Sequence, residues 1–130
     1  MVVLALRTDN PDAEVSLLSD QKELGYEKWI AHRELGVTLH EKIRGLLADN
    51  GLSWQDIEGV VVYAGPGSFT GLRIGLSVGN ALAQGLRVPI VSTNDSGWRA
   101  TGVEMLLLGE NHTPARPFYG APVHITAPKK

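Results

Sequence analysis

The spacing of apolar residues changes once along the chain, near Thr38, and this change sets the kind of fold that the sequence can form. Before it, apolar runs at residues 2–6, 14–18 and 24–31 are separated by turn residues, which predicts three antiparallel strands. Beyond it, stretches with helical spacing alternate with short apolar runs that are typical of buried strands. A three-stranded meander followed by this alternation predicts a mixed α/β sheet whose later strands are parallel.

The later segments have recognisable starts and stops. The first helix is expected from Thr38 to just before Gly51, and residues 53–56 have the capping-box pattern of a short helical turn. The other expected elements are a strand at 59–63, a helix ending near Arg87, a strand at 89–92, and a helix from residue 94 or 95 to about 109 with Trp98, Val103 and Leu106 inward. An RNase H-like fold with a five-stranded mixed sheet satisfies this order.

Length and proline distribution predict one domain and a tail. A chain of 130 residues is the usual size of one domain, and we expect the RNase H-like domain to occupy residues 1–112. Four of the seven prolines fall within residues 113–130, which are expected to be extended.

Charge and cysteine content exclude several classes of protein. The 12 basic and 14 acidic side chains give a net charge of −2, so phosphate backbones and anionic membranes are not generally attracted, and any RNA contact has to be local or supplied by a partner. Cysteine is absent, which excludes disulfides, thiol nucleophiles and thiolate zinc sites. No apolar run reaches the ~18 residues of a membrane helix, and we expect a cytoplasmic protein.

A glycine loop at residues 65–71 stands between an expected strand and an expected helix. Free backbone N–H groups there could hold an anion or nucleotide, with Gly65, Gly67, Ser68 and Thr70 as the candidate residues. The alternative is a tight turn in which glycine only permits close approach. No lysine follows as in a P-loop, and the spacing is one residue longer than in the dinucleotide motif.

As a specific string, GPGSFTGLRIG preceded by VVVYA resembles the signature of the bacterial TsaB (YeaZ) family. The resemblance continues at residues 46–57 and 88–92 and covers most of residues 1–92, and residues 117–130 look like the C-terminal tail of some members. Members are non-catalytic dimerisation subunits of the machinery that makes threonylcarbamoyladenosine in tRNA.

The resemblance implies the actin, hsp70 and acetate kinase type of RNase H-like fold. It also implies a TsaD partner that carries the metal and the transfer reaction, and a TsaE ATPase that acts on the pair. The chain itself would be a scaffold without catalytic residues, metal or cofactor, and it would meet tRNA only through the complex.

The sequence departs from the family pattern in three places. The first strand ends in Leu6-Arg7-Thr8 instead of Asp-Thr, so a cation replaces the carboxylate that related folds place near a metal-bound phosphate. Leu35 and Gly36 stand where a His-Ser pair often opens the first helix. Members also have a second RNase H-like half, which we expect this chain to lack together with half of any interdomain nucleotide cleft.

The second helix combines a narrow polar arc with a ridge of small residues. Its polar side chains fall within about 60° of the helix circumference; they are Arg73, Ser77, Asn80 and Gln84. A ridge of small residues recurs every four positions, at Gly71, Gly75, Gly79 and Ala83. Such a ridge lets another backbone approach closely, either the chain's own sheet or another molecule.

The resemblance favours a partner on this ridge, because TsaB and TsaD associate through helices of their first halves. The expected interface consists of Leu39, Ile43, Leu47, Gly71, Leu72, Gly75, Leu76, Gly79 and Ala83. Two rival hypotheses are a homodimer that buries the same ridge and a small phosphate or nucleotide enzyme that uses the glycine loop with Arg73.

The remaining polar residues assemble no catalytic motif. The four histidines, His32, His40, His112 and His124, lack the spacing of a helical metal site and are expected at the surface or as caps. Ser68 and Thr70 lack a nearby His or Asp, and turn chemistry accounts for Asp9 and Asp12.

Overall fold

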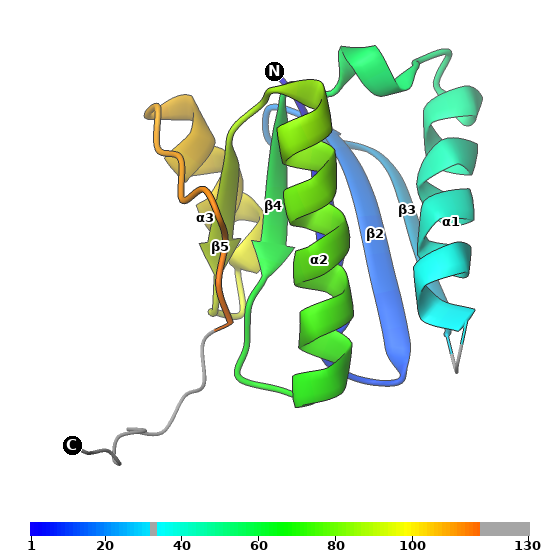
Figure 1. Cartoon of the computed structure of the whole chain (residues 1–130). Coiled ribbons are helices and arrows are strands. Elements are labelled where there is room, and N and C mark those ends of the chain that lie inside the picture. Colours follow the sequence, from blue (N-terminus) through cyan, green and yellow to red (C-terminus); the bar gives the residue numbers. More distant parts are fainter. Residues whose placement is uncertain (32–33, 118–130) are drawn as a thin grey trace, which may run out of the picture.

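The computed structural model describes residues 1–31 and 34–117, which form three layers around one five-stranded sheet. The strands are β1 (Val2–Arg7), β2 (Asp12–Ser19), β3 (Lys22–Ile30), β4 (Gly59–Tyr63) and β5 (Ile90–Thr93). The helices are α1 (Leu35–Asp49), η2 (Trp54–Asp56), α2 (Phe69–Leu86) and α3 (Trp98–Leu107). Figure 1 shows α1 and α2 on one face of the sheet and α3 on the other.

The strand order is β3-β2-β1-β4-β5. The first three strands are antiparallel neighbours, whereas β1 to β4 and β4 to β5 are parallel pairs. This is the predicted meander followed by parallel crossovers, and it confirms the mixed sheet of the RNase H-like fold. The predicted strands and helices are all present, with ends that differ by up to four residues.

The central strands supply both halves of the core. Alternate residues point to opposite faces, so Leu4 and Leu6 of β1 pack under α1 and α2, while Val3 and Ala5 pack under α3. All four are fully buried. Strands covered on both faces need continuous apolar runs, which is why β1 and β4 show no polar alternation.

Helix α2 lies very close to the sheet because glycines line its inner side. A Cβ placed on Gly79 would come within 2.6 Å of Val62 Cγ2 and 3.2 Å of Ile90 Cδ1. At Gly71 and Gly75 an added Cβ would collide with Thr8. The distance between α2 and the strands is therefore set by residues that have no side chain there.

A segment after α3 covers the open edge of β5. The His112 N–H donates to the carbonyl of Ile90 (2.7 Å) and the Ile90 N–H donates to Asn111 Oδ1 (3.3 Å). The Ser92 N–H donates to His112 Nδ1 at 3.0 Å. Asn80 of α2 then holds Ala115 through both its N–H (2.8 Å) and its carbonyl (3.0 Å). The segment thus links the sheet edge to α2.

The boundary predicted at residue 112 stays a prediction. Residues 113–117 carry on beside α2, and Ala115 is buried. The rest of the predicted tail, residues 118–130, lies outside the described residues, as does His32.

Outer face of helix α2 and the glycine loop

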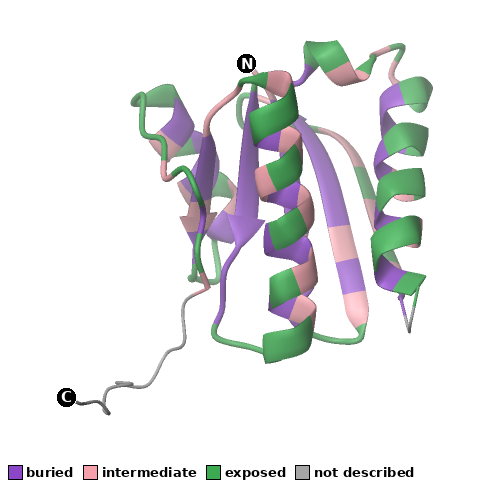
Figure 2. Ribbon diagram, in the orientation of Figure 1, coloured by how far each residue is buried: buried purple, intermediate pink, exposed green. Residues whose placement is uncertain are grey.

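The predicted interface residues lie on the inner sides of α1 and α2. Figure 2 shows the buried residues of both helices on the sides that face the sheet. All nine except Gly71 are buried; they are Leu39, Ile43, Leu47, Gly71, Leu72, Gly75, Leu76, Gly79 and Ala83. The ridge therefore packs against the chain's own sheet, as one of the two interpretations held. The sheet covers these side chains in the single chain, and their assignment as partner contacts stays a prediction.

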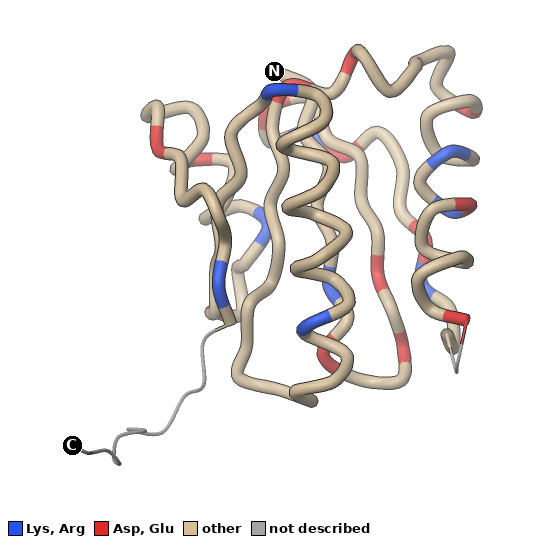
Figure 3. Tube along the Cα trace, viewed as in Figure 1, with Lys and Arg blue, Asp and Glu red and all other residues tan. Residues whose placement is uncertain are grey.

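The opposite side of α2 has the composition of a contact surface. We call Thr70, Arg73, Ile74, Ser77, Val78 and Ala81 the outer face. These positions follow helical spacing, and Ile74 and Val78 are half-buried while the other four are exposed. A shallow groove of about 300 Å³ runs along five of them. Arg73 is the single charged residue among the 18 of α2, and Figure 3 shows the length of this helix almost without charge.

A deeper depression adjoins the first turn of α2. It has a volume of about 540 Å³ and lies between the start of α2, the turn after β1 and the start of α1. Its apolar lining includes Ile30, Leu35 and Ile74, and Ile30 is 60% exposed. The depression extends the apolar character of the outer face toward α1.

The glycine loop is shaped by contacts with the β1–β2 turn. Gly65 has a φ of +109°, a conformation that favours glycine. A Cβ on Gly67 would collide with the Asp9 side chain. The Ser68 N–H donates to the Asp9 carbonyl at 2.8 Å, and the Ser68 side chain makes no capping hydrogen bond. The side of Gly67 where a side chain would stand is thus filled by Asp9 of the same chain, which leaves no room there for a bound anion.

An ion pair stands behind this loop. Asp9 is 8% exposed, and Arg7 donates to its carboxylate from Nε at 2.6 Å and from Nη2 at 3.2 Å. The Arg7 guanidinium carbon lies 3.8 Å from the centre of the Tyr63 ring. The hydrogen bond to Asp9 raises the pKa of Arg7 above its ordinary value, so Arg7 stays charged. Turn chemistry does not explain the Asp9 side chain as expected. Its carboxylate is bound by Arg7, and the side chain that stabilises the turn is Asn10, which accepts the Asp12 N–H.

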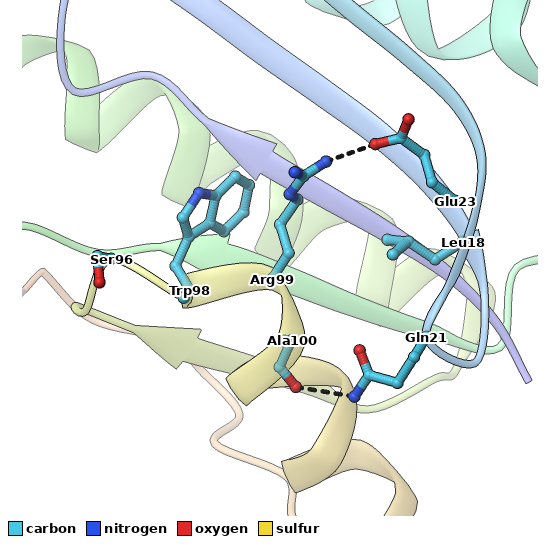
Figure 4. A pocket seen from close by; sticks show the side chains of 8 residues that line it. Leu18, Gln21, Glu23, Ser96, Trp98, Arg99 and Ala100 are labelled. Atoms are coloured by element: carbon cyan, nitrogen blue, oxygen red, sulfur yellow. Dashed lines mark hydrogen bonds and ion pairs between the residues drawn. The ribbon is translucent and has the colours of Figure 1, made fainter.

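A second cavity lies across the sheet, under α3. Its volume is about 240 Å³, and Figure 4 shows Arg99 turned toward Glu23 and Gln21 turned toward Ala100. Arg99 donates to Glu23 at 2.8 Å and Gln21 donates to the carbonyl of Ala100 at 3.1 Å. Arg99 also donates to Ser16, which is fully buried. These bonds hold the β2–β3 hairpin against α3, which accounts for the polar groups of this cavity.

The histidines that the structure describes have structural surroundings. His40 is exposed and stacks on Trp54 with a centroid distance of 4.8 Å. His112 accepts from the edge strand, so it caps backbone as expected. Within residues 1–31 and 34–117, no three acidic or histidine side chains lie together as metal ligands would, and no helix is long and apolar enough to cross a bilayer.

Sequence reasoning missed two features of this region. The sequence pattern does not distinguish the outer face, because its apolar members, Ile74 and Val78, belong to the same broad apolar arc as the buried residues. The role of Asp9 was hidden because aspartate next to asparagine and proline already looks like a turn. The signal that could have revealed it is Arg7, a charge at the end of a buried strand that needs a partner.

Comparison with known proteins identifies the relatives of this chain. The family model of TsaD, tRNA N6-adenosine threonylcarbamoyltransferase, matches residues 25–114. The tRNA threonylcarbamoyladenosine biosynthesis protein TsaB of Bacillus subtilis is 32% identical over 90 residues, which are 69% of this chain and 39% of that protein. TsaB of Escherichia coli is 28% identical over 113 residues, covering 82% of this chain and 48% of that protein.

A solved structure has the same arrangement. YeaZ from Pseudomonas aeruginosa superposes with a TM-score of 0.66 at 30% identity, over 72% of this chain and 44% of that one. The chain thus spans less than half the length of these relatives. The residues matched by the family model, 25–114, include the glycine loop, α1 and α2.

Proposed function

Because the chain belongs to the family of tRNA N6-adenosine threonylcarbamoyltransferase (TsaD), within its TsaB (YeaZ) group, we propose that it is a non-catalytic subunit that binds a TsaD-type enzyme during tRNA modification. In this proposal the chain contributes a docking surface, and the partner contributes the transfer of the threonylcarbamoyl group to adenosine.

The observation that carries the proposal is the outer face of α2. A helix that covers a sheet needs only one apolar stripe, and its opposite side is normally charged. Here the opposite side presents two half-buried aliphatic side chains, small residues and one arginine. Protein interfaces have this character, with charge depleted at the centre and polar groups at the rim.

The family match supports a TsaD-type partner in particular. The model that matches residues 25–114 is named for the enzyme, and this range contains α1 and α2. An enzyme of that family is therefore expected to carry a helix equivalent to α2. Two related helices with few charges can pack together along their length, as equivalent surfaces do in symmetric dimers.

The glycine loop supports a scaffold role over a nucleotide enzyme. Asp9 is the one buried acidic residue in the described part of the chain, and its carboxylate is bound by Arg7. It is therefore engaged and is not free to act as a general base or a metal ligand. We further propose that the complex works in the cytoplasm, that a TsaE-type ATPase acts on it, and that tRNA is reached through the partner.

The test mixes the purified chain with the TsaD-type enzyme of the same organism. Size-exclusion chromatography with light scattering is expected to give a 1:1 complex, and calorimetry a Kd of about 1 μM or tighter. Adding the chain is expected to raise tRNA modification by the enzyme, whereas the chain alone gives none. A chain that stays unbound at about 100 μM, or that modifies tRNA by itself, contradicts the proposal. A homodimer that persists beside the enzyme would instead favour self-association.

A further inference from the structure

The Arg7–Asp9 pair is not part of the outer face of α2, so a docking role of that face does not explain why the pair is there. A charge taken out of water destabilises the fold unless it is paired and hydrogen-bonded. The pair lies at the carboxyl ends of β1 and β4, with Tyr63 on the face of the sheet that α3 covers. The Arg7 side chain is therefore on the opposite side of the sheet from α2, whereas Asp9 lies beside the glycine loop, and the pair contributes no atom to the outer face.

The contacts of this cluster nevertheless lead to the start of α2. Asp9 accepts the Ser68 N–H through its carbonyl, and the Tyr63 hydroxyl donates to the carbonyl of Pro66 at 2.9 Å. The neighbouring Thr8 hydroxyl donates to the carbonyl of Gly71 at 2.7 Å. Three hydrogen bonds thus tie the glycine loop and the first turn of α2 to the ends of β1 and β4.

Arg7 contacts both Asp9 and Tyr63, the residues that make two of these hydrogen bonds. Its guanidinium holds the Asp9 carboxylate with two N–H groups and lies on the Tyr63 ring at the same time. The planar group suits both tasks, since it forms paired hydrogen bonds in its plane and stacks on aromatic rings through its face. A lysine at this position would keep the charge but lose the paired geometry and the stacking.

We propose that Arg7 is a positioning residue, which fixes Asp9 and Tyr63 and thereby holds the glycine loop and the first turn of α2 in the orientation that the partner binds. This inference rests on the proposed function, because it assigns Arg7 a role in the same docking event. It predicts that removing Arg7 loosens the loop locally and weakens binding without altering the outer face.

The first measurement is amide hydrogen exchange, which needs no partner. In Arg7→Ala, the Ser68 amide is expected to exchange about tenfold faster than in the wild type, because its acceptor at Asp9 is no longer fixed. The Thr101 amide, which donates to Gly97 at the start of α3, is the internal control and is expected to keep its rate. Arg7→Lys is expected to restore part of the protection of Ser68.

The second measurement is the affinity for the TsaD-type enzyme. Arg7→Ala is expected to weaken binding about tenfold and Arg7→Lys about threefold. The matched control is Arg99→Ala, which removes another arginine that binds a carboxylate and faces an aromatic ring on the same side of the sheet. It is expected to change affinity less than about twofold.

The outcomes separate this inference from the proposed function. A folded Arg7→Ala variant whose Ser68 amide stays protected overturns the positioning role. So does an affinity loss without faster exchange, because Arg7 would then act by direct contact. If the wild type does not bind the enzyme, the proposed function fails while hydrogen exchange still decides whether Arg7 holds the loop. Where Arg7→Ala does not fold, Arg7→Lys takes its place, because it loses the paired hydrogen bonds and the stacking while keeping the charge, and a Ser68 amide as protected as in the wild type then overturns the inference.

Discussion

Helices α1 and α2 cover the same face of the sheet and differ in what they present to solvent. α1 has four charged residues in 15 positions, Glu41, Lys42, Arg44 and Asp49, whereas α2 has only Arg73 in 18. Figure 3 shows the charges distributed along α1 and nearly absent from α2. Both helices bury an apolar stripe of about the same width, so core packing does not explain the difference.

A surface helix packs one side on the core, and its other side faces either solvent or another molecule. The outer side of α1 has the charges and exposed polar residues expected of a helix that ends at solvent. The outer side of α2 has one charge, Arg73, beside small polar residues and two half-buried aliphatic side chains. The difference points to a second surface that covers α2, and each prediction below tests whether the two helices respond differently to the same change.

The largest expected effect is on the inner side of α2. Gly79→Leu forces a side chain against Val62 and Ile90, and we expect a loss of stability of about 3 kcal/mol or more, or failure to fold. Gly45→Leu on α1 is the matched control, since an added Cβ there meets nothing within 4 Å. It is expected to stabilise the protein by about 0.5–1 kcal/mol through helix propensity. Urea unfolding measures both, and equal effects would mean that α2 is not held against the sheet by its glycines.

The next effect concerns the outer faces. Ala81→Lys on α2 is expected to weaken binding of the TsaD-type enzyme about tenfold or more, because a charge would be buried in the interface. Ala48→Lys adds the same side chain to the exposed side of α1 and is expected to leave affinity within about twofold. Both are expected to change stability by less than about 0.5 kcal/mol, as surface substitutions do. Calorimetry that finds the same loss for both variants removes the distinction between the helices.

A smaller effect is expected at the rim. Arg73→Ala deletes the only charge of α2, and we expect binding to weaken about threefold and to depend less on salt. Arg44→Ala on α1 is expected to change neither quantity. Affinity measured over a series of salt concentrations distinguishes the two, and a salt dependence that follows Arg44 would place the contact on α1.

The smallest expected effect concerns Tyr26 of β3, which lies outside both helices and serves as a control for binding. Burial and a hydrogen bond to Glu14 raise the pKa of Tyr26 above the ordinary value for tyrosine. Tyr26 therefore contributes stability below pH 10 that is lost as the pH rises through its folded pKa. Tyr26→Phe is expected to make the alkaline loss of stability slightly shallower without changing binding. Unfolding curves between pH 9 and about 11 test this, and an unchanged slope contradicts it.

Much of the fold follows from the spacing of apolar residues. Helical spacing, continuous apolar runs and turn residues indicate the regular elements that the structure describes. Ser53 and Asp56 form the predicted capping box, in which the Ser53 N–H donates to Asp56 at 2.7 Å. These features depend on neighbours in the sequence, which is why the sequence alone determines them.

The site was harder to predict because its contacts join distant residues. Asn80 belongs to the predicted polar arc of α2, yet it binds Ala115 rather than solvent. The small residues of α2 show that something comes close, but a helical wheel does not say whether that is a strand or another molecule. Only the structure, which places Val62 and Ile90 beside Gly79, shows that the close neighbour is the chain's own sheet.

The covered edge of β5 affects whether copies of the chain can associate by strand pairing. A strand with free N–H and C=O groups recruits strands from other chains, which leads to fibres and precipitates. At the other edge, β3 carries charged side chains near both ends, Lys22, Glu23, Glu27 and Lys28, which disfavour pairing with another strand. At β5 the side chains of Asn111 and His112 occupy the donors that a visiting strand would need. The segment after α3 thus disfavours the addition of a strand from another chain at this edge of the sheet.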